Sequence, residues 1–193
     1  MSDQGRSRLN SDVFDKLTGL QLEPAGALWR SPKSRSTLVA MTLFLVRHAS
    51  AFARTALDDD LDRPLDETGL EQASGIAQLL GERGITEIHS SRAIRCVQTV
   101  EPLAEQLELD INVHPALVEG QSAEMAVHTA RLLAKAGTTA VFSSHGDIIP
   151  DMIQTLAREG MVIVGPRSWA KGSTWELTTR GGDIAEAKFL GPF

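Results

Sequence analysis

The chain has 193 residues, of which 42% are hydrophobic and 23% are charged, and this composition is typical of a folded globular protein rather than a disordered one. A formal net charge of −6 gives no long-range attraction to a phosphate backbone, which argues against a general nucleic-acid binder. The single cysteine, Cys96, excludes an internal disulfide and a cysteine-based structural zinc site.

The first 40 residues mix serine, glycine, arginine and proline without a sustained apolar period. We therefore expect residues 1–40 to be a poorly ordered extension or to precede the true start at Met41, and residues 41–193 to form one domain. The sequence has neither an apolar run as long as a membrane span nor a secretory signal at its start, which favours a cytoplasmic protein that does not bind membranes.

From Met41 onward, strand and helix patterns alternate, which is typical of a mostly parallel sheet with helices on both faces. The predicted strands are 42–46, 85–89, 109–113, 139–143, 174–179 and 183–189, and the predicted helices are 69–80, 93–107, 122–136 and 148–158. The helix spacing places Leu70 and Leu80 on the same apolar face. The pair Gly181 and Gly182 predicts a tight hairpin between the last two strands. We therefore expect an α/β fold, a three-layer sandwich around a mostly parallel sheet.

In an open α/β sheet, ligands bind beyond the carboxyl ends of the strands. The predicted strand ends deliver charged and imidazole side chains to that edge: Arg47, His48, Arg92, Arg95, Glu119, His145 and Asp147. Buried cations need a partner, and an anionic ligand is the natural one. Arginine guanidinium groups form bidentate hydrogen bonds with phosphoryl oxygens, so arginines together with two imidazoles indicate a site for a phosphoryl group. Paired histidines without a Walker loop or a carboxylate cluster favour an imidazole nucleophile over a metal ligand, so no metal or other cofactor is expected.

Four motifs lie at these strand ends: LVRHAS at 45–50, SSRAIRCVQT at 90–99, LVEG at 117–120 and SSHGD at 143–147. In order and spacing they resemble the histidine phosphatase superfamily, which is phosphoglycerate mutase-like, and the similarity extends over 42–189. The segment RPLDETGLEQA at 63–73 resembles the connection into that family's first helix. The similarity is closest to the small bacterial phosphohistidine phosphatases, and it extends to the phosphatase-like domains found fused to Nudix hydrolases, although the chain has no Nudix motif.

The resemblance implies that His48 is the nucleophile that becomes phosphorylated. It also implies that Arg47, Arg95 and His145 bind the phosphate, and that Glu119 is the general acid and base. The substrate would be a phosphohistidine on a protein or a small phosphorylated molecule, and the reaction would need no metal.

Two further arginines, Arg54 and Arg92, are candidates for contacts to the substrate at the rim of the pocket. Asp147 competes with Glu119 as the proton donor, and its alternative role is to cap the following helix. The family usually has glycine where this chain has Ala49, and a methyl group there is expected to narrow the turn. Three alternatives stay open: a phosphate-binding pseudo-phosphatase with weak or no catalysis, a phosphatase specific for sugar or nucleotide phosphates, and a metal-dependent hydrolase built on the histidines.

Overall fold

The structure is a computed structural model that describes residues 41–54 and 59–191, all within one compact unit. The predictions for residues 1–40 lie outside the described residues. Within the described ranges, no helix combines the length and the apolar character needed to cross a membrane.

The described residues form one mixed sheet of seven strands in the order β3-β2-β4-β1-β6-β7-β5. The strands are β1 (Thr42–Arg47), β2 (Glu87–Ser90), β3 (Ile111–Val113), β4 (Ala140–Ser144), β5 (Val162–Val164), β6 (Thr174–Arg180) and β7 (Asp183–Gly191). Strands β3, β2, β4 and β1 are parallel neighbours, and β6 runs antiparallel to both β1 and β7. The carboxyl ends of β1, β2, β3 and β4 therefore meet at one edge.

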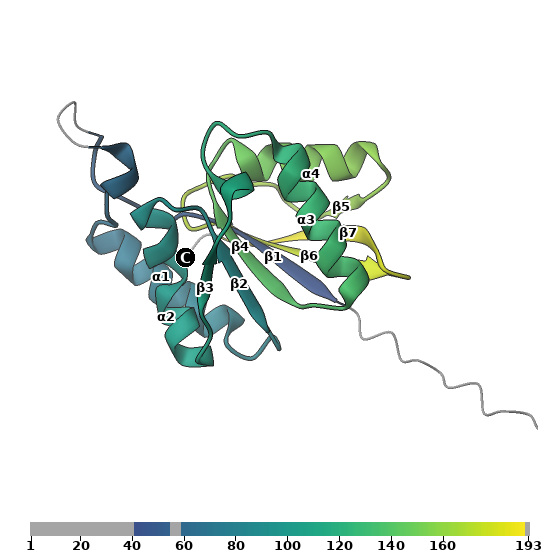
Figure 1. Cartoon of the computed structure of the whole chain (residues 1–193), viewed down its shortest axis with the longest axis horizontal. Helices are drawn as coiled ribbons and strands as arrows, with labels where there is room; N and C mark the ends of the chain where they lie inside the picture. Colours follow the sequence, from purple (N-terminus) through teal and green to yellow (C-terminus); the bar gives the residue numbers. More distant parts are fainter. Residues whose placement is uncertain (1–40, 55–58, 192–193) are drawn as a thin grey trace, which may run out of the picture. The chain divides into compact units, whose positions relative to one another are not determined.

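Four α-helices cover the two faces of the sheet: α1 (Glu67–Leu80), α2 (Ile94–Leu107), α3 (Ala123–Ala136) and α4 (Ile148–Arg158). Figure 1 shows α1 and α2 on one face and α3 and α4 on the other. In β1, the alternating side chains divide between the two faces, because Phe44 and Val46 pack with α1 and α2 whereas Leu43 and Leu45 pack with α3 and α4. The central strand is thus buried on both sides, as a continuous apolar run predicts.

The predicted α/β sandwich is confirmed, with two local differences. Leu70 does not face the core and is 54% exposed, because it lies in the first turn of α1, where Gly69 occupies the buried position. Strand β5, three residues at the edge of the sheet, was not predicted. The hairpin at Gly181 and Gly182 is present, and both residues have the positive φ that favours glycine, 65° and 91°.

The start of α1 passes very close to the segment that follows β1. A Cβ atom at Gly69 would lie 1.9 Å from the carbonyl oxygen of Ser50. Asp66 caps α1 by accepting a hydrogen bond from the Gly69 amide at 2.8 Å, and it accepts a second from the Ser50 hydroxyl at 2.7 Å. These contacts fix the strand end that carries Arg47 and His48 against α1.

We predict that Gly69→Ala lowers the free energy of unfolding by about 1–3 kcal/mol, because the backbone of Ser50 must move to admit the methyl group. The loss would occur although alanine has the better helix propensity. Chemical denaturation measures it. The matched control is Ser74→Ala, an exposed position on the same helix, which should change stability by less than about 0.5 kcal/mol. Equal stability of the two variants would contradict a rigid close approach.

Candidate active site

Two histidines from adjacent parallel strands face each other at the carboxyl edge of the sheet. His48 follows β1 and His145 follows β4, and the His48 amide donates to the carbonyl of Ser144 at 2.9 Å. The ring centroids are 5.5 Å apart, with an angle of 64° between the ring planes. Both side chains are buried. The pairing of the strands therefore brings together the two histidines that the sequence separates by nearly a hundred residues.

The contacts of His48 fix its tautomer. Nδ1 lies 2.8 Å from the carbonyl oxygen of Ala49, which only accepts, so Nδ1 carries the proton and Nε2 keeps a free electron pair. Burial lowers the pKa of His48 to about 3, and the positive charge of Arg95 acts in the same direction. At neutral pH His48 is therefore a neutral imidazole, which is the form that can act as a nucleophile.

His145 is also neutral, with the opposite tautomer. Its Nδ1 accepts from Nη2 of Arg95 at 3.2 Å, so Nε2 carries the proton and donates to the hydroxyl of Ser91 at 2.9 Å. Burial lowers its pKa to about 4, and the charge of Arg95 lowers it further. A negatively charged ligand beside His145 would reverse this balance and favour the protonated ring.

Arg95, in the first turn of α2, is the most buried charged group of the site, with 1% of its side chain exposed. Its Nη2 lies 2.8 Å from Oε2 of Glu119 and 3.1 Å from Oδ2 of Asp60, and its Nη1 donates to the carbonyl of Asp60 at 2.6 Å. Within the described residues, its buried Nε has no acceptor. Two carboxylates neutralise this guanidinium, as a buried cation requires.

Arg47 lies over the backbone that follows β4. A Cβ atom at Gly146 would be 2.6 Å from Cζ of Arg47, so the guanidinium packs directly on this glycine. Its Nη1 donates to the carbonyl of Trp169, and within the described part of the chain its Nε is buried without an acceptor. Buried donors without acceptors on Arg47 and Arg95 are what an anion site offers its ligand.

Asp147 holds the loop that carries Glu119. Its Oδ1 accepts from the amide of Ile148 at 2.9 Å and caps α4, and its Oδ2 accepts from the amide of Gly120 at 2.7 Å. The predicted cap is thus confirmed. Glu119 is 47% exposed, and its Oε2 lies 3.8 Å from Nδ1 of His145.

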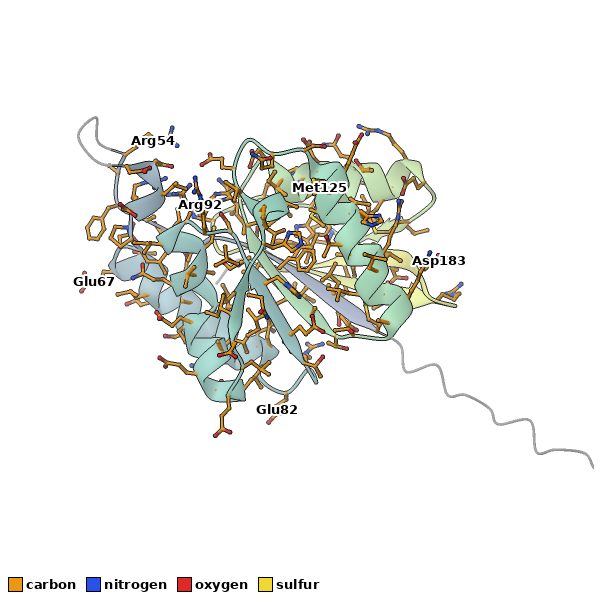
Figure 2. All side chains as sticks on the ribbon, in the orientation of Figure 1. Arg54, Glu67, Glu82, Arg92, Met125 and Asp183 are labelled. Atoms are coloured by element: carbon orange, nitrogen blue, oxygen red, sulfur yellow. The ribbon has the colours of Figure 1, made fainter. Side chains whose placement is uncertain are left out.

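The two rim arginines differ. Arg54 is drawn to the site: its Nη2 lies 2.9 Å from Oδ2 of Asp60 and 3.7 Å from Oε2 of Glu119. Arg92 is exposed, and Figure 2 shows it on the same side of the molecule as Arg54, whereas Glu82 before β2 lies at the opposite end. The sequence analysis missed Asp60 and Ser91, which contact Arg95 and His145. Asp60 lies in a run of acidic residues, and no sequence pattern distinguishes it from its neighbours. Ser91 lies within the motif SSRAIRCVQT, but the motif does not indicate its contact with His145.

Ala49 stands where the family usually has glycine. Its backbone stays outside the left-handed region, its methyl group packs with Ala51, Leu65 and Ala73, and its amide donates to the hydroxyl of Thr99 at 2.9 Å. Across residues 41–54 and 59–191, no three histidine, cysteine, aspartate or glutamate side chains are grouped so that they could hold a metal ion.

Comparison with known proteins identifies the family. The sequence profile of the histidine phosphatase superfamily (branch 1) matches residues 43–137. The chain belongs to the histidine phosphatase superfamily. The 8-oxo-(d)GTP phosphatase of Mycolicibacterium smegmatis is 32% identical to it over 194 residues, which cover 94% of this chain and 60% of the relative. A chloroplastic protein of Arabidopsis thaliana is 33% identical over 54% of this chain and 52% of its own length. The chain thus spans between half and two thirds of these curated relatives.

Solved structures show the same fold for this member of the histidine phosphatase superfamily. The putative phosphohistidine phosphatase SixA from Nakamurella has a TM-score of 0.63 and 23% identity, covering 79% of this chain and 96% of that one. SixA from Agrobacterium tumefaciens has a TM-score of 0.60 and 21% identity, covering 79% and 97%. The phosphoglycerate mutase-like architecture predicted from the sequence is therefore confirmed.

We predict that the buried histidines make stability fall with acid. Because their folded pKa values lie below the ordinary value near 6.5, the unfolded chain binds more protons between about pH 6.5 and pH 4. Their contribution is complete above that window and is lost as pH falls through it. Between pH 7.5 and 5 each histidine should cost up to about 2 kcal/mol of unfolding free energy.

Denaturant unfolding at the two pH values measures this loss, and His48→Gln should reduce it because the titrating group is removed. The control is His128→Gln, an exposed histidine on α3 outside the site. If His48→Gln shows the full wild-type loss, His48 is not a buried neutral imidazole.

Proposed function

We propose that this protein is a metal-independent phosphatase that acts through a phosphohistidine intermediate on His48. The observation that carries the proposal is the state of His48: a neutral imidazole whose Nδ1 proton is held by Ala49, so that Nε2 is a free nucleophile. The buried guanidinium donors of Arg47 and Arg95 supply the positive field that a phosphoryl group needs.

Binding begins with an exchange of anions on Arg95. In the free protein the carboxylate of Glu119 takes the Nη2 donor, at 2.8 Å. A phosphoryl oxygen competes for the same donor, and Glu119 can leave because its side chain is 47% exposed. The negative charge of the substrate also raises the proton affinity of His145, so that this ring can donate to a phosphoryl oxygen.

The first chemical step is an in-line displacement. Nε2 of His48 forms a bond to phosphorus while the bond from phosphorus to the leaving group breaks. The leaving atom takes a proton from Glu119, which has bound this proton from solvent after leaving Arg95. The guanidinium groups of Arg47 and Arg95 stabilise the charge that spreads over the equatorial oxygens. Glu119 can take this role because, once displaced from Arg95, it stands at the exposed side of the pocket where a leaving group would lie.

The second step returns the enzyme to its initial state. A water molecule attacks phosphorus and gives a proton to Glu119, the bond between phosphorus and Nε2 breaks, and inorganic phosphate leaves. Glu119 releases this proton to solvent when it pairs with Arg95 again. His48 regains its free electron pair. Every proton and electron pair is accounted for by side chains and water, so neither step calls for a metal ion.

The proposed substrates are a phosphohistidine on a protein and small phosphomonoesters. A second candidate class is nucleotide phosphates, which the 32% identity to the mycobacterial 8-oxo-(d)GTP phosphatase over 94% of this chain favours. The exposed arginines Arg54 and Arg92 suit either substrate class. Substrates of both classes carry further negative charge or polar groups beyond the phosphate that is cleaved, and these groups can bind arginine.

We predict that the protein releases phosphate in the presence of EDTA and that His48→Ala abolishes this release. The measurement is phosphate release from an aryl phosphate, a nucleoside triphosphate and a phosphohistidine protein, with acid-labile phosphate trapped on the quenched wild-type enzyme. His128→Ala serves as the control and should remain active. Activity that survives His48→Ala would contradict the covalent route, loss of activity in EDTA would contradict metal independence, and vanadate binding without turnover would identify a pseudo-phosphatase.

We predict opposite effects of Glu119→Gln on binding and on turnover. Removing the competing charge should tighten orthovanadate binding roughly tenfold, whereas kcat should fall about 100-fold for an alkyl phosphate, whose leaving group needs a proton. The fall should be much smaller for an aryl phosphate with an acidic phenol. Glu124→Gln, an exposed glutamate on α3, is the control. Weaker vanadate binding in Glu119→Gln would exclude the exchange of anions on Arg95.

A further inference from the structure

One carboxylate outside the four family motifs contacts three arginines. Asp60 begins the short 3-10 helix η2 (Asp60–Asp62), and its Oδ1 accepts from Nε of Arg54 and Nε of Arg63, each at 2.9 Å. Its Oδ2 accepts from Nη2 of Arg54 at 2.9 Å and lies 3.1 Å from Nη2 of Arg95. The contact to Arg54 is bidentate, which fixes the plane of a guanidinium as well as its position.

The main chain of Asp60 adds a contact that the side chain does not provide. Its carbonyl oxygen accepts from Nη1 of Arg95 at 2.6 Å. Nη1 and Nη2 of this buried guanidinium therefore both contact Asp60. Nη1 contacts the backbone carbonyl, and Nη2 contacts the carboxylate. Because a guanidinium is planar, two such contacts set its orientation, and with it the direction in which the remaining donors point.

A carboxylate near an anion site lowers the attraction for the anion, so its presence needs a physical reason. Arg54 supplies it, since its side chain is 63% exposed and a free arginine at such a position would sample many rotamers in solvent. Pairing with Asp60 instead holds its Nη2 within 3.7 Å of Oε2 of Glu119, the carboxylate that contacts Arg95. Asp60 thus holds the guanidinium groups of Arg54 and Arg95 close to the same point, Oε2 of Glu119.

We propose that Asp60 is a positioning residue that aligns Arg54 and Arg95 as a paired clamp on the bound phosphoryl group. The inference rests on the proposed phosphatase function for its catalytic consequence, but the clamp itself is defined by oxyanion binding. The contact with Asp60 already holds the Arg54 side chain in the conformation in which it can bind the phosphoryl group. When Glu119 leaves, Arg54 therefore does not have to give up the freedom of a long exposed side chain. Arg63, with only 15% of its side chain exposed, completes the pairing and anchors η2.

The test combines orthovanadate binding by calorimetry with steady-state kinetics on an aryl phosphate, for wild type, Asp60→Asn, Arg54→Ala and the double variant. Asp60→Asn and Arg54→Ala should each weaken vanadate binding roughly tenfold, the change expected when a charge-assisted contact is lost. KM should rise by a similar factor with kcat changed less. In the double variant, Arg54→Ala should add less than about twofold, because the two residues act as one unit.

Asp62→Asn removes the same charge from an exposed residue of η2 and should bind vanadate like wild type. Additive effects of Asp60→Asn and Arg54→Ala would overturn the proposal, and so would wild-type vanadate affinity in either single variant. If Asp60→Asn does not fold, the exposed Arg54→Ala variant still decides, since unchanged binding contradicts a clamp. Wild-type protein that binds vanadate without hydrolysing phosphate would reject the proposed function alone, because the binding data test the clamp separately.

Discussion

The burial of one guanidinium, that of Arg95, sets the rest of the site. Taking a positive charge out of water is costly, and removing one partner of a buried ion pair typically costs about 3–5 kcal/mol. The fold meets this demand by bringing two acids from separate loops to the first turn of α2, Asp60 before α1 and Glu119 after β3. The same demand suits the proposed function, since a phosphoryl dianion can neutralise Arg95 in place of a carboxylate.

Burial keeps the two histidines neutral, and the positive charge of Arg95 reinforces its effect. Burial is the largest cause that lowers the pKa values of His48 and His145, and the charge of Arg95 lowers both further. The same burial that makes Arg95 need a counter-charge therefore also keeps the two imidazoles unprotonated at neutral pH. The price is stability in acid, where both rings gain protons more readily in the unfolded chain.

The sequence predicted the strand-end residues because the rule that places them is geometric. Parallel strands end at a common edge, so Arg47, His48 and His145 had to meet once the strands were identified. Asp60 lay beyond such reasoning, since nothing in a run of aspartates distinguishes the one whose carboxylate reaches three arginines. Its position depends on where the chain after β1 crosses α2, which is a property of packing and not of local pattern. The short edge strand β5 was also not predicted.

The alanine that replaces the family's usual glycine shows how packing absorbs a departure from a motif. The methyl group of Ala49 enters a cluster made of Ala51, Leu65 and Ala73, where two small side chains leave room for it. The amide of Ala49 donates to the hydroxyl of Thr99, and that hydroxyl donates to the carbonyl of Arg95 at 2.6 Å. The turn that carries His48 is therefore tied to the helix that carries Arg95. Because this connection runs through the backbone amide and the methyl has its own space, the substitution leaves Nε2 of His48 free, and Ala49 by itself gives no physical reason to expect a loss of catalysis.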